Sequence, residues 1–192
     1  MAPRTGQAIL EVLLLCILVF LAQVVSLTFG LSGMEFFALS VPLSEYPWTI
    51  VVSVYAHGGI DHLIANIIGL LVFGFIVERR SSRARFHAFV LGTGAIAGIA
   101  EVLVGSMLGP SPLVLGISGA VFALMGYVLT SNPVAESVFG WLEMDLKVQL
   151  VLMVVLALAI TWITRGERVA LVAHFTGFLL GLIAGRAHLL KA

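Results

Sequence analysis

Long hydrophobic runs separated by short polar segments make up most of the 192-residue chain. A helix needs about 20 apolar residues to cross a hydrocarbon layer of about 30 Å. Six runs come near this length: Ile9–Gly30, Thr49–Val77, Phe86–Leu108, Ile117–Asn132, Val148–Ile163 and Val169–Leu189. The pattern therefore predicts an all-α, polytopic membrane protein with six transmembrane helices. We expect one membrane domain over residues 1–192, since no repeat or soluble appendage is visible.

Composition agrees with a membrane protein. Hydrophobic residues make up 60% of the chain and charged residues 10%, with a mean hydropathy of +1.14, which argues against a water-soluble globular domain. The first apolar run is too long for the core of a signal peptide. The single Cys16 excludes a disulfide framework and a thiolate metal site. A net charge of zero gives no indication of nucleic-acid binding.

Positive charges are unevenly distributed between the expected loops. Six spans place both termini on one side, and eight cations fall there: Arg4, Arg79, Arg80, Arg83, Arg85, Lys147, Arg186 and Lys191. Only Arg165 and Arg168 fall on the other side. Because cytoplasmic loops are enriched in Lys and Arg, we expect both termini in the cytoplasm. The outer loop from Leu31 to Trp48 then carries several aromatic residues, which fit a membrane interface or a loop lying partly in the bilayer.

Small residues recur on one face of each of two expected spans. They are Gly177, Gly181 and Gly185 on the sixth span, and Gly119, Ala123 and Gly126 on the fourth. Such faces let two helices approach closely in a membrane. We expect these two helices to pack together and to bring their polar residues near each other.

Ser118 is a candidate nucleophile. The span that it opens has about 16 apolar residues, or about 24 Å of helix, so its start is expected below the membrane surface. Free N–H groups at a helix start, flanked by Gly116 and Gly119, are suited to hold an oxyanion. The alternative is that Ser118 simply caps its helix.

A serine needs a general base, and His174 is the candidate. It lies a few residues into the last expected span, at a depth similar to that of Ser118. The alternative is a histidine that is hydrogen-bonded in the core. His62 and Asn66, four residues apart, share a helix face and can donate to an oxyanion without adding a buried charge. The spacing of His57 and His62 turns their side chains apart on a regular helix, which disfavours a metal site, and Asp61 is expected only as a helix cap.

Together these residues resemble the rhomboid family of intramembrane serine proteases. The pattern consists of His-x4-His-x3-Asn ending at Asn66, Gly-x-Ser-Gly around Ser118, and Ala-His-x-x-Gly-x-x-x-Gly around His174. The resemblance extends from about Trp48 to Gly185. It implies a Ser118–His174 dyad without an acidic third member, and an oxyanion held by His62, Asn66 and the Ser118 N–H.

Other positions are similar to the family or depart from it. Glu78 resembles a position at the inner end of the family's second helix. Trp48 is followed by Thr49 where many rhomboids have arginine, and Phe122 stands where many have a tyrosine that packs on the catalytic histidine. Glu101, inside the third span, is either a structural hydrogen-bonding residue or part of a water-filled cavity.

The resemblance implies an endopeptidase in the cell membrane that cuts single-span membrane-protein substrates near their outer end. It implies no cofactor, metal, nucleic acid or obligatory oligomer. Two alternatives stay open. One is an inactive relative that binds transmembrane helices, although such proteins usually lack the serine or the histidine. The other is a small transporter, or a haem or metal protein, that uses His57, His62 and His174.

Overall fold

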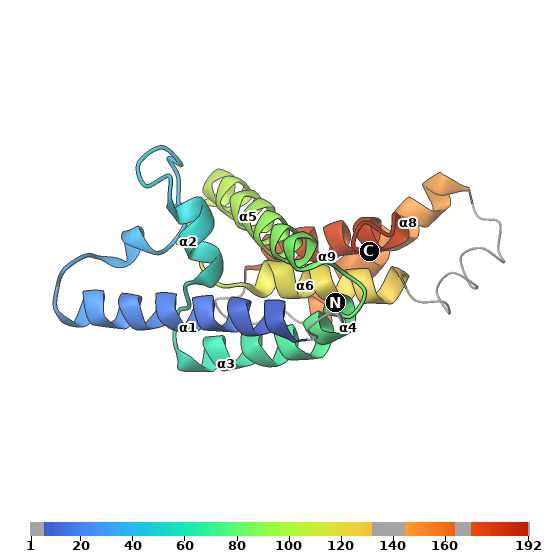
Figure 1. Cartoon of the computed structure of the whole chain (residues 1–192). Helices are drawn as coiled ribbons and strands as arrows, with labels where there is room; N and C mark the ends of the chain where they lie inside the picture. Colours follow the sequence, from blue (N-terminus) through green and yellow to red (C-terminus); the bar gives the residue numbers. More distant parts are fainter. Residues whose placement is uncertain (1–5, 132–144, 164–169, 192) are drawn as a thin grey trace.

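Helices form nearly all of the regular structure in the computed structural model (Figure 1). The structure describes residues 6–131, 145–163 and 170–191. The long helices are α1 (Gln7–Thr28), α5 (Arg83–Leu108), α6 (Ser118–Thr130), α8 (Leu146–Ile163) and α9 (Leu171–Arg186). A short helix α2 (Thr49–Tyr55) precedes a continuous helical stretch made of α3 (Ile60–Gly69), the π-helical turn η2 (Leu70–Gly74) and α4 (Phe75–Glu78). Within the described residues, the only β pairing is a bridge between Leu39 and Val114.

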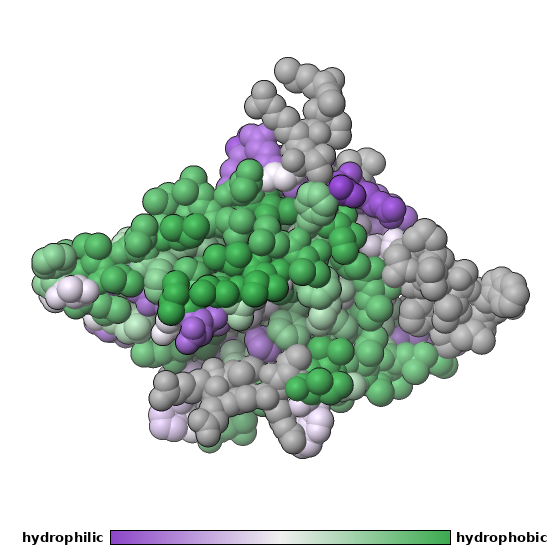
Figure 2. Space-filling model, turned by 90° about the horizontal axis from the view of Figure 1, so that it is seen from below, coloured by the Kyte–Doolittle hydropathy of each residue, from purple (hydrophilic) through white to green (hydrophobic). Residues whose placement is uncertain are grey.

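The helices are those of a membrane protein. In the described part of the chain, α1, α5 and the stretch Ile60–Glu78 are each long and apolar enough to cross a bilayer, while α6, α8 and α9 are shorter apolar helices. Figure 2 shows one face of the molecule covered mostly by hydrophobic residues. The prediction of an all-helical, polytopic membrane protein is confirmed. The number of six spans and the cytoplasmic termini stay predictions, and Arg4, Arg165 and Arg168 lie outside the described residues.

The expected second span, Thr49–Val77, was wrong at its start. The chain leaves the helix after Tyr55, and a new helix begins at Ile60. Two features explain the break. Gly58 and Gly59 have low helix propensity, and the Gln23 side chain satisfies the backbone of His57, accepting from its N–H at 3.2 Å and donating to its carbonyl at 2.9 Å. The backbone of His57 therefore has buried partners outside any helix.

Helix α6 occupies the centre of the fold. It contacts α9 and α5 as well as α3, η2 and α4, and it lies between these groups in Figure 1. The predicted meeting of two small-residue faces is seen here. A Cβ added at Gly177 would overlap the backbone of Gly119, and one added at Gly181 would overlap the backbone of Ala123. Only glycine at these two positions allows α9 to reach the backbone of α6.

Carboxylates tie the beginning of α1 to its neighbours. Glu78, at the end of α4, is buried and accepts hydrogen bonds from the backbone N–H groups of Gly6 at 2.8 Å and Ala8 at 2.6 Å. A carboxylate at this place stabilises the helix start because the N–H groups there have no partners within the helix. Glu11 of α1 accepts from Arg83 and pairs with His87, both at 2.8 Å, which links α1 to α5.

Candidate active site

The segment before Ser118 is held by two elements distant in the sequence. Val114 and Leu39 exchange two backbone hydrogen bonds, at 2.7 and 2.9 Å, and the Gly116 N–H donates to the carbonyl of Ser53 at 2.8 Å. Ser118 is the first residue of α6, and Ile117 occupies the N-cap position without a side-chain capping bond. The alternative of Ser118 as a simple N-cap is therefore wrong, and its hydroxyl is not used to cap the helix.

His174 lies in the first turns of α9 and packs on α6. Its ring stacks on that of Phe122, with centroids 4.1 Å apart and an angle of 20° between the planes. Phe122 follows Ser118 by four residues, so the two lie on the same face of α6. Gly177 approaches the backbone of Gly119 closely. These glycines follow His174 and Ser118 within one turn of their helices, so this contact aligns α9 with α6 in the same way as the ring stacking does. Both contacts place the start of α9 beside the start of α6.

Space for a small molecule lies next to Ser118. A cavity of about 20 Å³ is lined by Gly116, Ser118 and Gly119 from the α6 side, and by Ala170 and Ala173 from the α9 side. This volume is enough for about one water molecule. No hydrogen bond among the described residues joins Ser118 to His174. Such bonds are often long in unliganded enzymes and shorten only when substrate binds.

Nδ1 of the His174 ring is buried and has no hydrogen-bonding partner within the described ranges. In particular, no described carboxylate reaches this atom.

His62 and Asn66 converge on Gly116, two residues before Ser118. A Cβ added at Gly116 would lie 2.7 Å from Cε1 and 2.9 Å from Nε2 of His62, and 3.7 Å from Nδ2 of Asn66. Gly116 also has a φ of +118°, which disfavours any side chain. Glycine is thus required twice here, by its backbone conformation and by the imidazole in front of it. The structure brings together His62, Asn66 and Gly116.

His57 is closer to His62 than the spacing predicted. The expectation of well-separated side chains was wrong, because the helix begins only at Ile60 and His57 lies in the break before it. The two rings meet edge to face with centroids 5.3 Å apart. His57 is fully buried, and its Nδ1 is 3.0 Å from the carbonyl of Tyr55. His57 thus packs behind His62 and supports the position of that ring.

Two acidic residues have definite places. Glu101 of α5 accepts a hydrogen bond at 2.9 Å from the backbone N–H of Ala173, the residue before His174. Of the two roles considered for Glu101, the structure gives a structural hydrogen bond. Asp61 does not cap its helix as expected. Gly59 is the N-cap residue and no side-chain capping bond forms, so Asp61 lies in the first turn.

Gln23 was not among the residues predicted to shape the site. This residue of α1 is 3% exposed and binds the backbone of His57 on both sides. The available signal was a polar residue inside an otherwise apolar span, which by default has a function or a partner. Its effect on the site is indirect, through the break that precedes His62.

Trp48 belongs to an aromatic cluster in the loop between α1 and α2. Its ring lies 5.8 Å from that of Phe36 and 5.3 Å from that of Tyr46, and its indole N–H donates to the carbonyl of Phe36 at 3.1 Å. Thr49 is buried and donates to the carbonyl of Tyr46 at 2.6 Å. Both residues stabilise the loop itself.

Comparison with known proteins gives a consistent assignment. The family model described as "Rhomboid domain" matches residues 44–191. RHOMBOID-like protein 5 of Arabidopsis thaliana is 30% identical over 148 residues, which cover 75% of this chain and 45% of the plant protein. Rhomboid protease GlpG of Haemophilus influenzae is 24% identical over 184 residues, 95% of this chain and 91% of that protein. The chain thus spans less than half of the plant relative but nearly all of the bacterial one.

Proposed function

The chain belongs to the rhomboid family, and we propose that it is a serine endopeptidase that cleaves transmembrane segments of other membrane proteins. Membership rests on a family match that covers most of the chain. One observation carries the catalytic proposal: His174 stacks on Phe122, one turn along α6 from Ser118, where the small-residue faces of α6 and α9 meet. We further propose that residues 1–192 form one membrane domain with six spans and cytoplasmic termini, in the cell membrane.

The reaction follows from these residues. The Ser118 hydroxyl attacks the scissile carbonyl carbon while His174 takes its proton. The resulting oxyanion is held by the N–H of Ser118 and by two side chains that meet at Gly116, the Asn66 amide and the His62 imidazole. His174 then gives the proton to the leaving amine, and the C–N bond breaks to leave an ester on Ser118. A water molecule hydrolyses this ester with His174 again acting as base, which restores the free serine.

The surroundings of the histidine support a dyad. Nδ1 of His174 has no partner among the described residues, and the carboxylate of Glu101 accepts a hydrogen bond from the Ala173 N–H. Phe122 lacks the hydroxyl of the tyrosine found in many rhomboids, but that hydroxyl takes no part in the proposed reaction. The Phe122 ring still packs on His174. A substrate would be a single-span protein whose helix unwinds near its outer end, since the peptide must be extended to reach Ser118.

Labelling with a serine-directed fluorophosphonate tests the proposal. The wild-type chain in detergent or liposomes should be labelled, whereas Ser118→Ala and His174→Ala should not be. Both variants should also lose cleavage of a model transmembrane substrate while remaining folded, which thermal unfolding checks. Ser118→Ala removes one hydroxyl and should be neutral, whereas His174→Ala also removes the ring that stacks on Phe122 and should lose some stability. Cleavage retained in either variant contradicts the dyad. A wild type that is neither labelled nor active, but still binds the substrate helix, supports a non-catalytic member of the family instead.

A further inference from the structure

A second cavity lies at the end of the molecule away from Ser118. Its volume is about 230 Å³, and its walls come from the end of α4, the end of α6 and the C-terminal segment. Three of its lining residues are cations: Arg79, Arg80 and Lys191. None of these residues takes part in the proposed reaction. We infer that this cavity binds the phosphate headgroup of an anionic glycerophospholipid.

The charged residues that line the cavity in the described part of the chain are all cations. No acidic side chain lines it in the described part of the chain. The nearest acid in sequence, Glu78, directs its carboxylate to the N–H groups of Gly6 and Ala8 and so does not neutralise Arg79 or Arg80. Arginine side chains bind phosphate oxygens in a bidentate manner, and basic pockets between transmembrane helices bind acidic headgroups.

The cavity lies at the level in the membrane where lipid headgroups are found. Arg79 and Arg80 directly follow the apolar helical stretch that ends at Glu78, and Lys191 follows the end of α9. Cations at the ends of apolar helices lie at the level of the lipid headgroups. Phe75 and Ile76, one turn earlier, line the same cavity and are 41% and 48% exposed, as expected for side chains that face lipid. A bound lipid can therefore place its phosphate on the cations and its acyl chains along these residues.

Packing keeps the walls in place. The guanidinium of Arg79 lies 4.3 Å from the centre of the Phe75 ring. The hydroxyl of Tyr127, itself 4% exposed, accepts a hydrogen bond from the N–H of Leu190 at 3.2 Å, and Arg85 donates to the carbonyl of Lys191 at 2.5 Å. These two bonds hold the C-terminal segment against α6 and the start of α5. The site is thus assembled from three separate parts of the chain, which favours one headgroup bound at a defined position.

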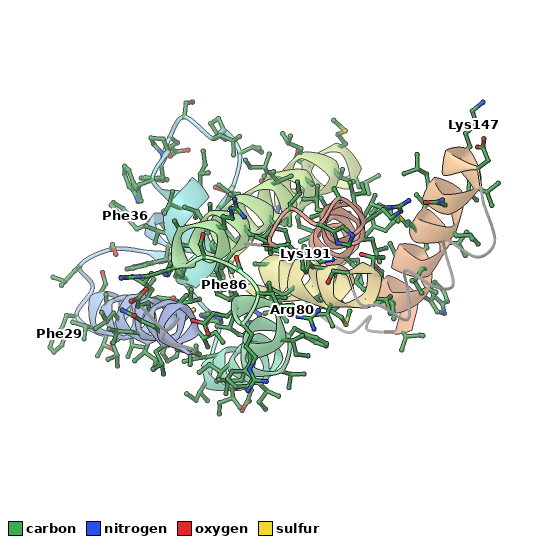
Figure 3. All side chains as sticks on the ribbon, turned by 45° about the vertical axis from the view of Figure 1, so that its right-hand side comes forward. Phe29, Phe36, Arg80, Phe86, Lys147 and Lys191 are labelled. Atoms are coloured by element: carbon green, nitrogen blue, oxygen red, sulfur yellow. The ribbon has the colours of Figure 1, made fainter. Side chains whose placement is uncertain are left out.

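Lipid binding to the purified full chain can be measured by native mass spectrometry in neutral detergent. We expect one molecule of phosphatidylglycerol to be retained in preference to phosphatidylcholine. Arg79→Gln and Arg80→Gln should each weaken this binding about five-fold, the loss typical of one cation near a charged membrane surface. Lys147→Gln is the matched control, because it removes the same charge at the far end of α8, well apart from Arg80 and Lys191 (Figure 3). It should bind phosphatidylglycerol like the wild type.

Several outcomes would overturn the inference. One is equal retention of both lipids by the wild type, a result that needs no variant. Another is equal loss in Lys147→Gln, which indicates a general charge effect. A third is full competition by soluble glycerol 3-phosphate at the same concentration, which indicates a site for free phosphate. Thermal unfolding of each variant checks that the exposed replacements leave the fold intact.

Discussion

The carboxylate of Glu101 on α5 accepts a hydrogen bond from the backbone N–H of Ala173, so a partly buried side chain of one helix holds the first turn of the helix that carries His174. An acidic side chain is favourable at a helix start, where N–H groups lack partners and the helix dipole is positive. The next residue along α9 is the proposed base. The position of His174 therefore depends on a residue that performs no chemistry.

Replacing Glu101 should affect stability and rate together. Glu101→Leu removes the cap, and we expect a loss of about 0.5–2 kcal/mol in the free energy of unfolding. It should also lower kcat by about ten-fold or more, because small displacements of a catalytic group are costly. Glu101→Gln keeps an acceptor oxygen and should recover most of the rate. Measurements of kcat and of thermal unfolding on both variants test whether Glu101 positions His174. Equal kcat values in Glu101→Leu and wild type would exclude this role.

His62 and Asn66 should contribute to rate more than to substrate binding. Loss of one oxyanion donor typically lowers kcat by about 10²–10³-fold. We expect His62→Ala and Asn66→Ala each to lower kcat by this factor or by less, because the Ser118 N–H still donates to the oxyanion. Saturating substrate isolates kcat from KM in this measurement. If only KM rises, the two residues bind substrate and the assignment to the oxyanion fails.

Glycine at position 181 should be essential, in contrast to glycine at position 92. An added methyl at Gly181 overlaps the backbone of Ala123, whereas an added methyl at Gly92 meets nothing within 4 Å. Gly181→Ala should therefore separate α9 from α6 and reduce thermal stability and cleavage in parallel. Gly92→Ala should be neutral or slightly stabilising, because alanine favours helix by about 1 kcal/mol. Similar behaviour of the two variants would show that close packing of α6 and α9 does not matter.

Gln23 should act on the site from the first helix. Gln23→Leu keeps a similar side-chain volume but leaves the N–H and carbonyl of His57 buried without their partner. An unsatisfied buried group costs about 1–3 kcal/mol, so a clear drop in thermal stability is expected. Cleavage should fall as well, because the break that orients His57 and His62 loses its anchor. Unchanged stability and rate in Gln23→Leu would show that Gly58 and Gly59 alone maintain the break.

Much of the fold follows from local properties of the sequence. Hydrophobic length indicated the membrane helices, and several ends agree closely: the third expected span, Phe86–Leu108, is α5, Arg83–Leu108. Glycine spacing predicted which faces of α6 and α9 meet. Motif spacing identified Ser118, His174, His62 and Asn66 as the candidates. The inferences about helices and their meeting faces succeed because hydrophobicity, helical period and side-chain size are read from neighbouring residues. The site residues stay a prediction.

Only the tertiary structure decided the features that depend on distant partners. The break before Ile60, the contact of His57 with His62 and the cap on α9 each need a group from another helix. Gln23 lies 34 residues before His57, and Glu101 lies 72 residues before Ala173. A buried polar group must find a partner, but the sequence does not say which of the many possible partners is near. The packing of the helices decides which partner each buried polar group meets. It therefore also decides how the candidate residues are held in place.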